Sequence, residues 1–346
     1  MKNHDLNESA RQEAAVRWNA VAKPLHSLGK LEDMIVQIAG IQETADVCLS
    51  PRCVLVFCGD HGVVAEGVSQ SGQEVTALVA RSIAQGSANV NLMAAVSRTD
   101  VYAVDMGMAQ DVPGMIVRKR AYGTQNMTRV AAMTSAQAEA AVQAGMDLVG
   151  EMKARGYRLI ATGEMGIGNT TASTAMACAL LGLSAEELTG RGAGLSDAGL
   201  ARKIKAIELA LAVNQPDSRD PMDVLAKVGG FEIAGMAGSF LGGMQHRVPI
   251  VIDGMISAVA ALLAVRLCPQ ARNFMLPSHM SREPAMRRIM QELALEPMIH
   301  AQLALGEGTG AVTLLPLLDM ARRIYAGTHT FDDLGMQAYT PQEGKA

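Results

Sequence analysis

Val54-Leu55-Val56-Phe57-Cys58-Gly59-Asp60-His61-Gly62 is a short apolar run followed at once by glycine and polar residues. Four more apolar runs, each followed by Asp, Gly or Pro, occupy residues 101–104, 159–162, 249–252 and 273–276. Helical patterns fill the intervals, at residues 135–155, 170–181, 198–214, 231–244 and 256–265. Short apolar strands that alternate with helices predict a parallel sheet covered on both faces.

The sequence therefore predicts an α/β protein with a Rossmann-like central parallel sheet and helices on both faces. Helical segments also precede the first strand and follow the last one, and we expect them to pack together as a small helical domain. The expected boundaries are 46–300 for the α/β catalytic domain, and 1–45 with 301–346 for the small domain.

Composition excludes several functions. The net charge of −4 leaves no basic surface for nucleic acid, and 11 aromatic residues are too few for base stacking. The N-terminal residues are polar and lack the apolar core of a signal peptide. The most apolar long segment, residues 248–268, is interrupted by Asp253 and Arg266. We expect no membrane span and a cytoplasmic location.

The five cysteines are an odd number, which favours free thiols in a reducing compartment. Cys48, Cys53 and Cys58 are spaced C-x4-C-x4-C, and such spacing can bind a metal. Cys58, however, ends the apolar run of a predicted strand. Burial of these thiols in the core is therefore the favoured interpretation over a metal site.

Ligands of such sheets bind outside the carboxyl ends of the strands. Polar side chains follow the predicted strands at Asp60, His61, Asp105, Glu164, Asp253, Ser278 and His279. A serine hydrolase would need a G-x-S-x-G elbow, which is absent, and His61 and His279 lack zinc-ligand partners at useful spacing. Taken singly, each polar residue is also explained as an ordinary strand terminator.

The segment Gly163–Thr171 follows an apolar run and opens an Ala-rich helix. Glycines let the backbone approach a ligand, and the free N–H groups of a helix start suit a phosphate. The pattern is neither G-x-x-x-x-G-K-[ST] nor G-x-G-x-x-G. Tight packing is the alternative explanation, but Glu164 favours a functional one because it adds a carboxylate beside the phosphate site.

Two further segments carry candidate residues. Glu307 is flanked by Gly306 and Gly308 and precedes an apolar helix, an arrangement that suits a general base, although the helix dipole also favours Glu there. Gly192–Asp197 is followed by Lys203, which is either a ligand-binding residue or an ordinary solvated lysine.

Five strings occur in a characteristic order: Lys23–Glu32 (KPLHSLGKLE), Asp60–Val63 (DHGV), Gly67–Ser69 (GVS), Glu164–Thr171 (EMGIGNTT) and Gly306–Ala311 (GEGTGA). In these strings the chain resembles the nicotinate-nucleotide–dimethylbenzimidazole phosphoribosyltransferases of cobalamin synthesis. The resemblance runs from about residue 23 to 320, almost the whole chain.

The resemblance implies a reaction. Such enzymes move the phosphoribosyl group of nicotinate mononucleotide onto a ring nitrogen of 5,6-dimethylbenzimidazole, which gives α-ribazole 5′-phosphate and nicotinate. No cofactor and no metal are implied, because the leaving pyridinium is already cationic. The family forms homodimers.

The resemblance also implies site residues. Glu307 matches the family's general base, and Glu164 would stabilise an oxocarbenium-like transition state. Gly166, Gly168, Asn169 and Thr170 would hold the 5′-phosphate. The remaining expected substrate-binding residues are Lys203, Ser69, Gln73, Pro24, Asp253, Ser278 and Ser281.

The chain departs from the family's usual pattern in places. Ser71-Gly72 replaces an aromatic–Pro pair, His26 replaces a glycine, and Pro284 also stands where a glycine is usual. Because residues 69–73 are expected to line the base pocket, the preferred base stays open. The alternatives are a phosphoribosyltransferase with another aromatic acceptor and a non-catalytic nucleotide sensor.

Overall fold

The computed structural model describes residues 5–340, and its six strands form one parallel sheet in the order β3-β2-β1-β4-β5-β6. The strands are β1 (Arg52–Gly59), β2 (Asp100–Gly107), β3 (Ile116–Val117), β4 (Leu159–Met165), β5 (Ile250–Ile252) and β6 (Met275–Pro277). This is the doubly wound order, with the reversal between β1 and β4. The predicted Rossmann-like α/β fold is confirmed.

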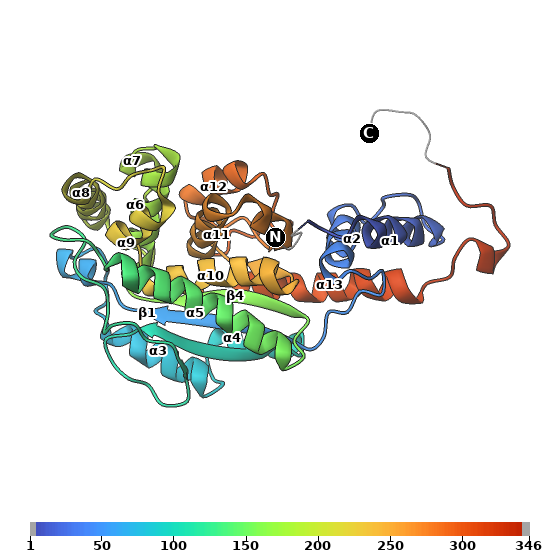
Figure 1. The fold of residues 1–346 in the computed structure, drawn as a ribbon, viewed down its shortest axis with the longest axis horizontal. Helices are drawn as coiled ribbons and strands as arrows, with labels where there is room; N and C mark the ends of the chain where they lie inside the picture. Colours follow the sequence, from blue (N-terminus) through green and yellow to red (C-terminus); the bar gives the residue numbers. More distant parts are fainter. Residues whose placement is uncertain (1–4, 341–346) are drawn as a thin grey trace.

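Helices cover both faces of the sheet (Figure 1). One face carries α5 (Ser135–Ala154), α6 (Asn169–Leu181), α9 (Pro221–Val228), α10 (Phe231–His246), α11 (Met255–Leu267) and α12 (Ala285–Leu293). The other carries α3 (Glu74–Ala84), α4 (Asn89–Val96) and α13 (Thr309–Gly327). The remaining elements are α1 (Glu8–Ala20), α2 (Lys30–Gln42), α7 (Ala185–Leu188), α8 (Asp197–Asn214), and the 3₁₀ turns Gly62–Glu66, Pro269–Phe274 and Asp332–Leu334.

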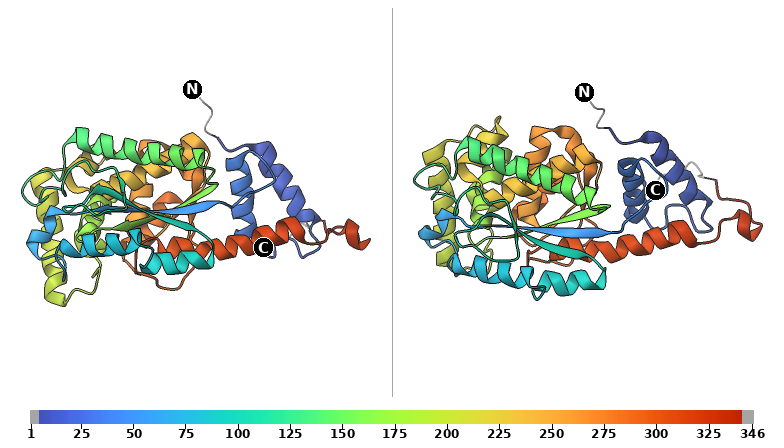
Figure 2. Two further views of the ribbon diagram at one scale, coloured as in Figure 1. Left: turned by 90° about the horizontal axis from the view of Figure 1, so that it is seen from below. Right: turned by 60° about the horizontal axis from the view of Figure 1, so that its bottom comes forward.

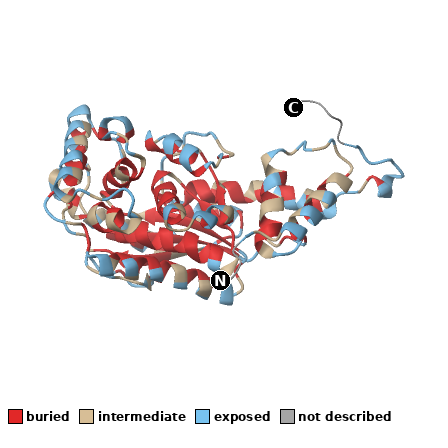
Figure 3. Ribbon diagram, turned by 45° about the horizontal axis from the view of Figure 1, so that its top comes forward, coloured by how far each residue is buried: buried red, intermediate tan, exposed pale blue. Residues whose placement is uncertain are grey.

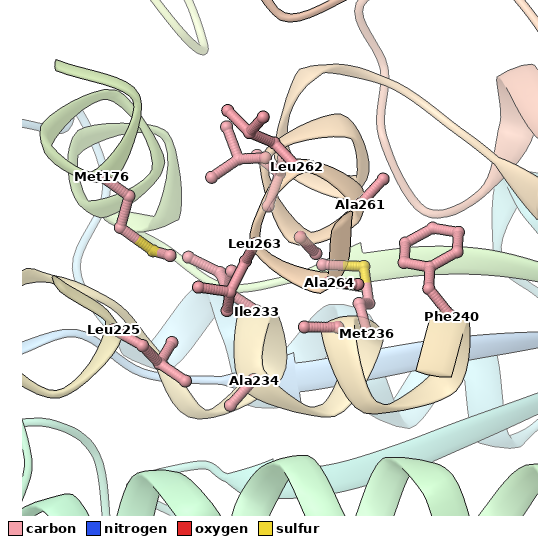
Figure 4. Close-up of a cluster of buried hydrophobic side chains, with 14 of the residues drawn as sticks. Met176, Leu225, Ile233, Ala234, Met236, Phe240, Ala261, Leu262, Leu263 and Ala264 are labelled. Carbon is pink, nitrogen blue, oxygen red and sulfur yellow. The ribbon is translucent and has the colours of Figure 1, made fainter. Parts of the chain in front are cut away.

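The sheet separates two apolar cores. Along β1, Leu55 and Phe57 belong to one core, whereas Val54 and Val56 belong to the other. Every residue of β1 is buried, which explains why its sequence is continuously apolar instead of alternating. Figure 3 shows the buried sheet and the buried inner sides of its helices, and Figure 4 shows side chains of α6, α10 and α11 that fill part of the first core.

The cysteine spacing acquires a simple explanation from β1. Cys53 packs in one core and Cys58 in the other, so the strand directs the two thiols to opposite faces of the sheet. Within residues 5–340 no group of three potential ligands is placed to hold a metal ion. Burial lifts the pKa of both thiols, as expected for inert core cysteines.

The terminal helices meet at one end of the molecule, beside the sheet (Figures 1 and 2). The rings of Trp18 in α1 and Tyr325 in α13 lie 5.0 Å apart, and the N–H of Phe331 donates to the carbonyl of Ala20 at 3.0 Å. The amino half of α13, in contrast, packs on the sheet through Leu314 and Leu315. Because α13 belongs to both regions, the boundaries at residues 46 and 300 stay a prediction.

In the described range, none of the helices combines the length and the apolar character that a bilayer crossing requires.

Candidate active site

A cavity of about 310 Å³ lies at the carboxyl ends of β4, β5 and β6. Its lining residues fall within six segments, 68–70, 164–170, 191–195, 253–257, 279–283 and 303–309, together with Val79 and Lys203. The cavity lies at the carboxyl ends of the strands, where the polar residues of the sequence predicted a site.

Most of the predicted site residues line this cavity: Ser69, Glu164, Gly166, Gly168, Asn169, Thr170, Lys203, Asp253, Ser281 and Glu307. Three do not. The side chain of Gln73 donates to the carbonyl of His61 at 2.9 Å, and the hydroxyl of Ser278 donates to the carbonyl of Ile252 at 2.6 Å. Pro24 lies in the segment between α1 and α2. The roles of these three residues stay predictions.

The loop that carries Glu307 has an unusual backbone. Gly306, Glu307 and Gly308 all have left-handed conformations, with φ of 87°, 60° and 89°. The loop crosses β4 so closely that a Cβ at Gly163 would lie 2.6 Å from the carbonyl oxygen of Glu307. The flanking glycines therefore serve to turn the chain over the strand, and the turn aims Glu307 into the cavity wall.

Glu164 and Glu307 are adjacent in space. The N–H of Glu307 donates to the carbonyl of Glu164 at 3.2 Å, and both residues are about nine-tenths buried. The carboxylate of Glu307 accepts the N–H of Val90, and that of Glu164 accepts the side-chain amide of Asn169. Burial, reinforced by the nearby carboxylate of Asp253, raises the pKa of Glu164 to about 8.

Asp253 has a structural task that the sequence did not reveal. Its carboxylate accepts the N–H of Gly308 at 3.2 Å and the N–H of Ala311 at 2.9 Å. Asp253, which follows β5, thereby caps the start of α13. It also faces His279, whose pKa is lowered by burial although Asp253 opposes that shift. Asp253 thus anchors the loop that presents Glu307.

The Gly166–Thr171 loop rests on the end of β1. A Cβ at Gly166 would lie 2.2 Å from the carbonyl oxygen of Gly59, and the N–H of Ile167 donates to the hydroxyl of Thr76 at 3.1 Å. In the described chain, no acceptor is bonded to the N–H groups of Gly168 and Thr170. These two amides are the ones available to an anion at the start of α6.

Lys203 of α8 reaches this loop. Its ammonium donates to the hydroxyl of Thr170 at 2.8 Å and to the carbonyl of Gly190 at 3.1 Å. Lys203 is only 1% exposed, which excludes the solvated-lysine interpretation. Within residues 5–340 its ammonium forms no ion pair within 4 Å, and burial lowers its pKa to about 8 although the carboxylate of Glu283 opposes that shift. A buried cation that forms no close ion pair among the described residues, beside free amides, is a site for an anionic group.

Asp60 and His61 follow β1 as predicted, but they do not line the cavity. The ring of His61 is 2.7 Å from the carboxylate of Glu232, and both residues are buried. Burial alone would lower the pKa of His61, but Glu232 and Asp60 outweigh burial and raise it. Because His61 packs against Gly168, the His61–Glu232 pair supports the Gly166–Thr171 loop.

Sequence reasoning missed two charged residues of the cavity wall, Arg191 and Glu283. Arg191 donates to the carbonyl of Leu195 and pairs with Asp197, which lies at the start of α8. Glu283 lies two residues beyond Ser281 and had no glycine or strand end to mark it.

A doubly wound sheet with a buried cation and two buried carboxylates in one cavity defines the class: an α/β protein suited to an anionic small molecule. A family model described as "Phosphoribosyltransferase" matches residues 4–336. The chain belongs to the nicotinate-nucleotide–dimethylbenzimidazole phosphoribosyltransferase family.

Named members of the family are similar over nearly their whole length. The nicotinate-nucleotide–dimethylbenzimidazole phosphoribosyltransferase of Ruminiclostridium cellulolyticum is 43% identical over 341 residues, which cover 98% of this chain and 97% of the relative. The enzyme of the same name from Desulforudis audaxviator is 45% identical over 334 residues, 96% of this chain and 95% of the relative. The crystal structure of CobT from Thermus thermophilus superposes with a TM-score of 0.89 at 40% identity, and covers 95% of this chain and 99% of that chain.

Proposed function

We propose that this chain transfers the phosphoribosyl group of nicotinate mononucleotide to a ring nitrogen of 5,6-dimethylbenzimidazole, with α-ribazole 5′-phosphate and nicotinate as products, in cobalamin biosynthesis. One observation carries the proposal. A single cavity holds the buried ammonium of Lys203 and the buried carboxylates of Glu164 and Glu307. The ammonium suits a phosphate, and the two carboxylates suit the transfer of a positively charged sugar centre to a neutral nitrogen base that carries one N–H proton.

The phosphate end of the donor would lie on the Gly166–Thr171 loop. The free N–H groups of Gly168 and Thr170, the hydroxyl of Thr170 and the ammonium of Lys203 are all suitable donors for it. Asn169 would act differently, because its side chain is already engaged with Glu164. Its part in binding would be to orient that carboxylate.

Glu307 would act as the general base. One nitrogen of the benzimidazole forms a bond to the anomeric carbon, the bond from that carbon to the nicotinate nitrogen breaks, and its electron pair neutralises the pyridinium. The proton on the other benzimidazole nitrogen passes to Glu307. Attack on the face opposite the leaving group converts the β-nucleotide into an α-nucleotide.

Glu164 would stabilise the positive charge that grows on the sugar. A pKa of about 8 keeps its carboxyl mostly protonated in the empty site at neutral pH. The positive charge of a bound pyridinium favours the ionised form, so donor binding itself would create the stabilising carboxylate.

The acceptor would enter along the apolar part of the cavity wall, formed by Val68, Val79, Met165, Leu303 and Leu305. Ser69 and Gln70 line the same part, whereas Ser71, Gly72 and Gln73 do not. Ser69 is thus the polar residue best situated to orient the base.

The test is to incubate the purified protein with nicotinate mononucleotide, with and without dimethylbenzimidazole, and to measure free nicotinate and α-ribazole phosphate by chromatography. Release of nicotinate that requires dimethylbenzimidazole supports the proposal. Release that requires a different base supports the alternative acceptor, and donor binding without release under any base supports the nucleotide sensor. Glu307→Gln is the matched inactive control.

We further propose that the enzyme is a cytoplasmic homodimer. The packed helices α4 and α13 expose Leu92, Val96 and Met320 at 67%, 79% and 60%, and a second copy of this chain would cover such an apolar surface. Free thiols at all five cysteines suit a reducing compartment. Light scattering should give twice 36.4 kDa, and Val96→Glu should give the monomer mass.

A further inference from the structure

Glu283 presents an unsatisfied carboxylate to the cavity. It lines the wall just before α12, and its Oε2 is buried against Gly190, where a Cβ would lie 1.9 Å from that oxygen. Among the residues that the structure describes, none donates a hydrogen bond to either oxygen of this carboxylate. A carboxylate held in a cavity wall without donors gains stability when a ligand supplies them.

The surroundings of Glu283 restrict which ligand group that is. Gly190 lies between it and Lys203: the carbonyl of Gly190 accepts a hydrogen bond from the ammonium, while its Cα faces the carboxylate, and the two charges attract each other without forming a direct ion pair. An anion bound to Lys203 would repel Glu283, so the phosphate itself is excluded as its partner. The nicotinate carboxylate is also excluded as the partner of Glu283, because two carboxylates repel each other. The neutral donors next to the phosphate in a nucleotide are the hydroxyls of its ribose.

We propose that Glu283 accepts hydrogen bonds from the ribose 2′- and 3′-hydroxyls of the nucleotide donor and makes the enzyme selective for ribose over deoxyribose. The inference rests on the proposed function for the position of the phosphate. A carboxylate can accept from both hydroxyls of a cis-diol, and neither oxygen of Glu283 has a competing donor in the part of the chain that the structure describes. Glu283 would thus fix the sugar between the phosphate loop and the two buried carboxylates.

The test compares two enzymes, each with three nucleotide donors. The kcat/KM of the wild type and of Glu283→Ala is measured with nicotinate mononucleotide and with its 2′-deoxy and 3′-deoxy analogues. Removal of a hydroxyl also changes the intrinsic reactivity of the glycosidic bond, but this change is common to both enzymes and cancels in the ratio. The wild type should prefer the ribonucleotide over at least one analogue by about tenfold more than Glu283→Ala does.

A second variant separates contact from folding. Gly190→Ala keeps the Glu283 carboxylate but places a methyl group 1.9 Å from its Oε2 and 2.9 Å from Cδ of Pro284, so the Glu283 side chain must move and the start of α12 must shift slightly. It should lose the same selectivity as Glu283→Ala. Glu292→Gln, an exposed change on α12, should keep the wild-type ratio. Equal ribose selectivity in the wild type and Glu283→Ala, with both analogues, would overturn the proposal.

A binding measurement keeps the inference independent of turnover. Calorimetry compares ribose 5-phosphate with 2-deoxyribose and 3-deoxyribose 5-phosphates on the wild type and Glu283→Ala. If nicotinate is never released but Glu283 still selects the ribose phosphate, the proposed reaction fails and the role of Glu283 stands. If nicotinate is released and the selectivity does not depend on Glu283, the role of Glu283 fails and the reaction stands.

Discussion

The ammonium of Lys203 lies 2.8 Å from the hydroxyl of Thr170, and the loop that carries Thr170 leaves two amide groups free among the described residues. Replacement of this lysine by methionine preserves the length of the side chain and removes its charge. We predict that Lys203→Met raises the KM for nicotinate mononucleotide by about 10- to 100-fold, the usual worth of a hydrogen bond to a charged group. The KM for the benzimidazole should change little, and an equal rise in both KM values would contradict a phosphate role.

The same lysine should make the stability of the protein depend on pH. Its pKa falls from 10.5 to about 8 because it is buried, so the unfolded chain binds more protons than the folded one between these values. The contribution of Lys203 to the free energy of unfolding should therefore rise with pH from about 8 to about 10.5, whereas buried thiols such as Cys53 and Cys58, whose pKa values are raised, act in the opposite direction in both proteins. Urea titrations should show that the stability of the wild type relative to Lys203→Met increases across this range. A parallel pH dependence in both proteins would refute the assignment.

The two carboxylates should differ in their variants. Glu307→Gln keeps the shape of the side chain but cannot take a proton, and loss of a general base costs about 10²–10⁴-fold in rate. We expect a fall in kcat of that order with little change in donor affinity, measured by steady-state kinetics and calorimetry. Glu164→Gln should be milder. Near-normal turnover in Glu307→Gln together with an inactive Glu164→Gln would reverse the two roles.

The pH profile of kcat/KM for nicotinate mononucleotide should be bell-shaped around pH 8. Ionisation of Glu164 raises it on the acid side, and loss of the proton from Lys203 lowers it on the alkaline side, because both groups have a pKa of about 8 in the free enzyme. Glu164→Gln should lack the acid limb and Lys203→Met the alkaline limb. Unchanged limbs in these variants would assign the profile to other groups.

Acceptor tolerance should be broad. Ser71 and Gly72 do not line the cavity, so beyond Ser69 and Gln70 no side chain of this segment limits the size of the base. We predict that bases larger than dimethylbenzimidazole are also used. Competition between pairs of bases, with both nucleotide products measured, checks this expectation. A strong and exclusive choice of dimethylbenzimidazole would disprove it.

Strands with buried residues were predictable from sequence, and the short edge strand β3 was not. β1 and β4 carry apolar runs because each lies between two cores. β3 consists of Ile116 and Val117 alone, and two residues at the edge of a sheet carry no periodic pattern. Its pairing with β2 becomes visible only in the folded molecule.

Site residues were predictable where the neighbouring sequence marks them, and not where only the fold brings them together. Glu164 and Glu307 could be singled out because glycines at a strand end or helix start mark them locally. Nothing local marks Glu283, because its partner surface at Gly190 is brought to it only by folding. The capping of α13 by Asp253 was missed for the same reason, since it joins residues 55 and 58 positions apart.

The contact between Trp18 and Tyr325 has a consequence for the synthesis of the chain. A ribosome releases the N-terminal end first, at about 5–20 residues per second, so Tyr325 emerges roughly 300 residues and tens of seconds after Trp18. Trp18 therefore lacks its contact with Tyr325 until the whole sheet has been translated. The packing surface of α1 around Trp18 therefore stays incomplete until α13 has been synthesised.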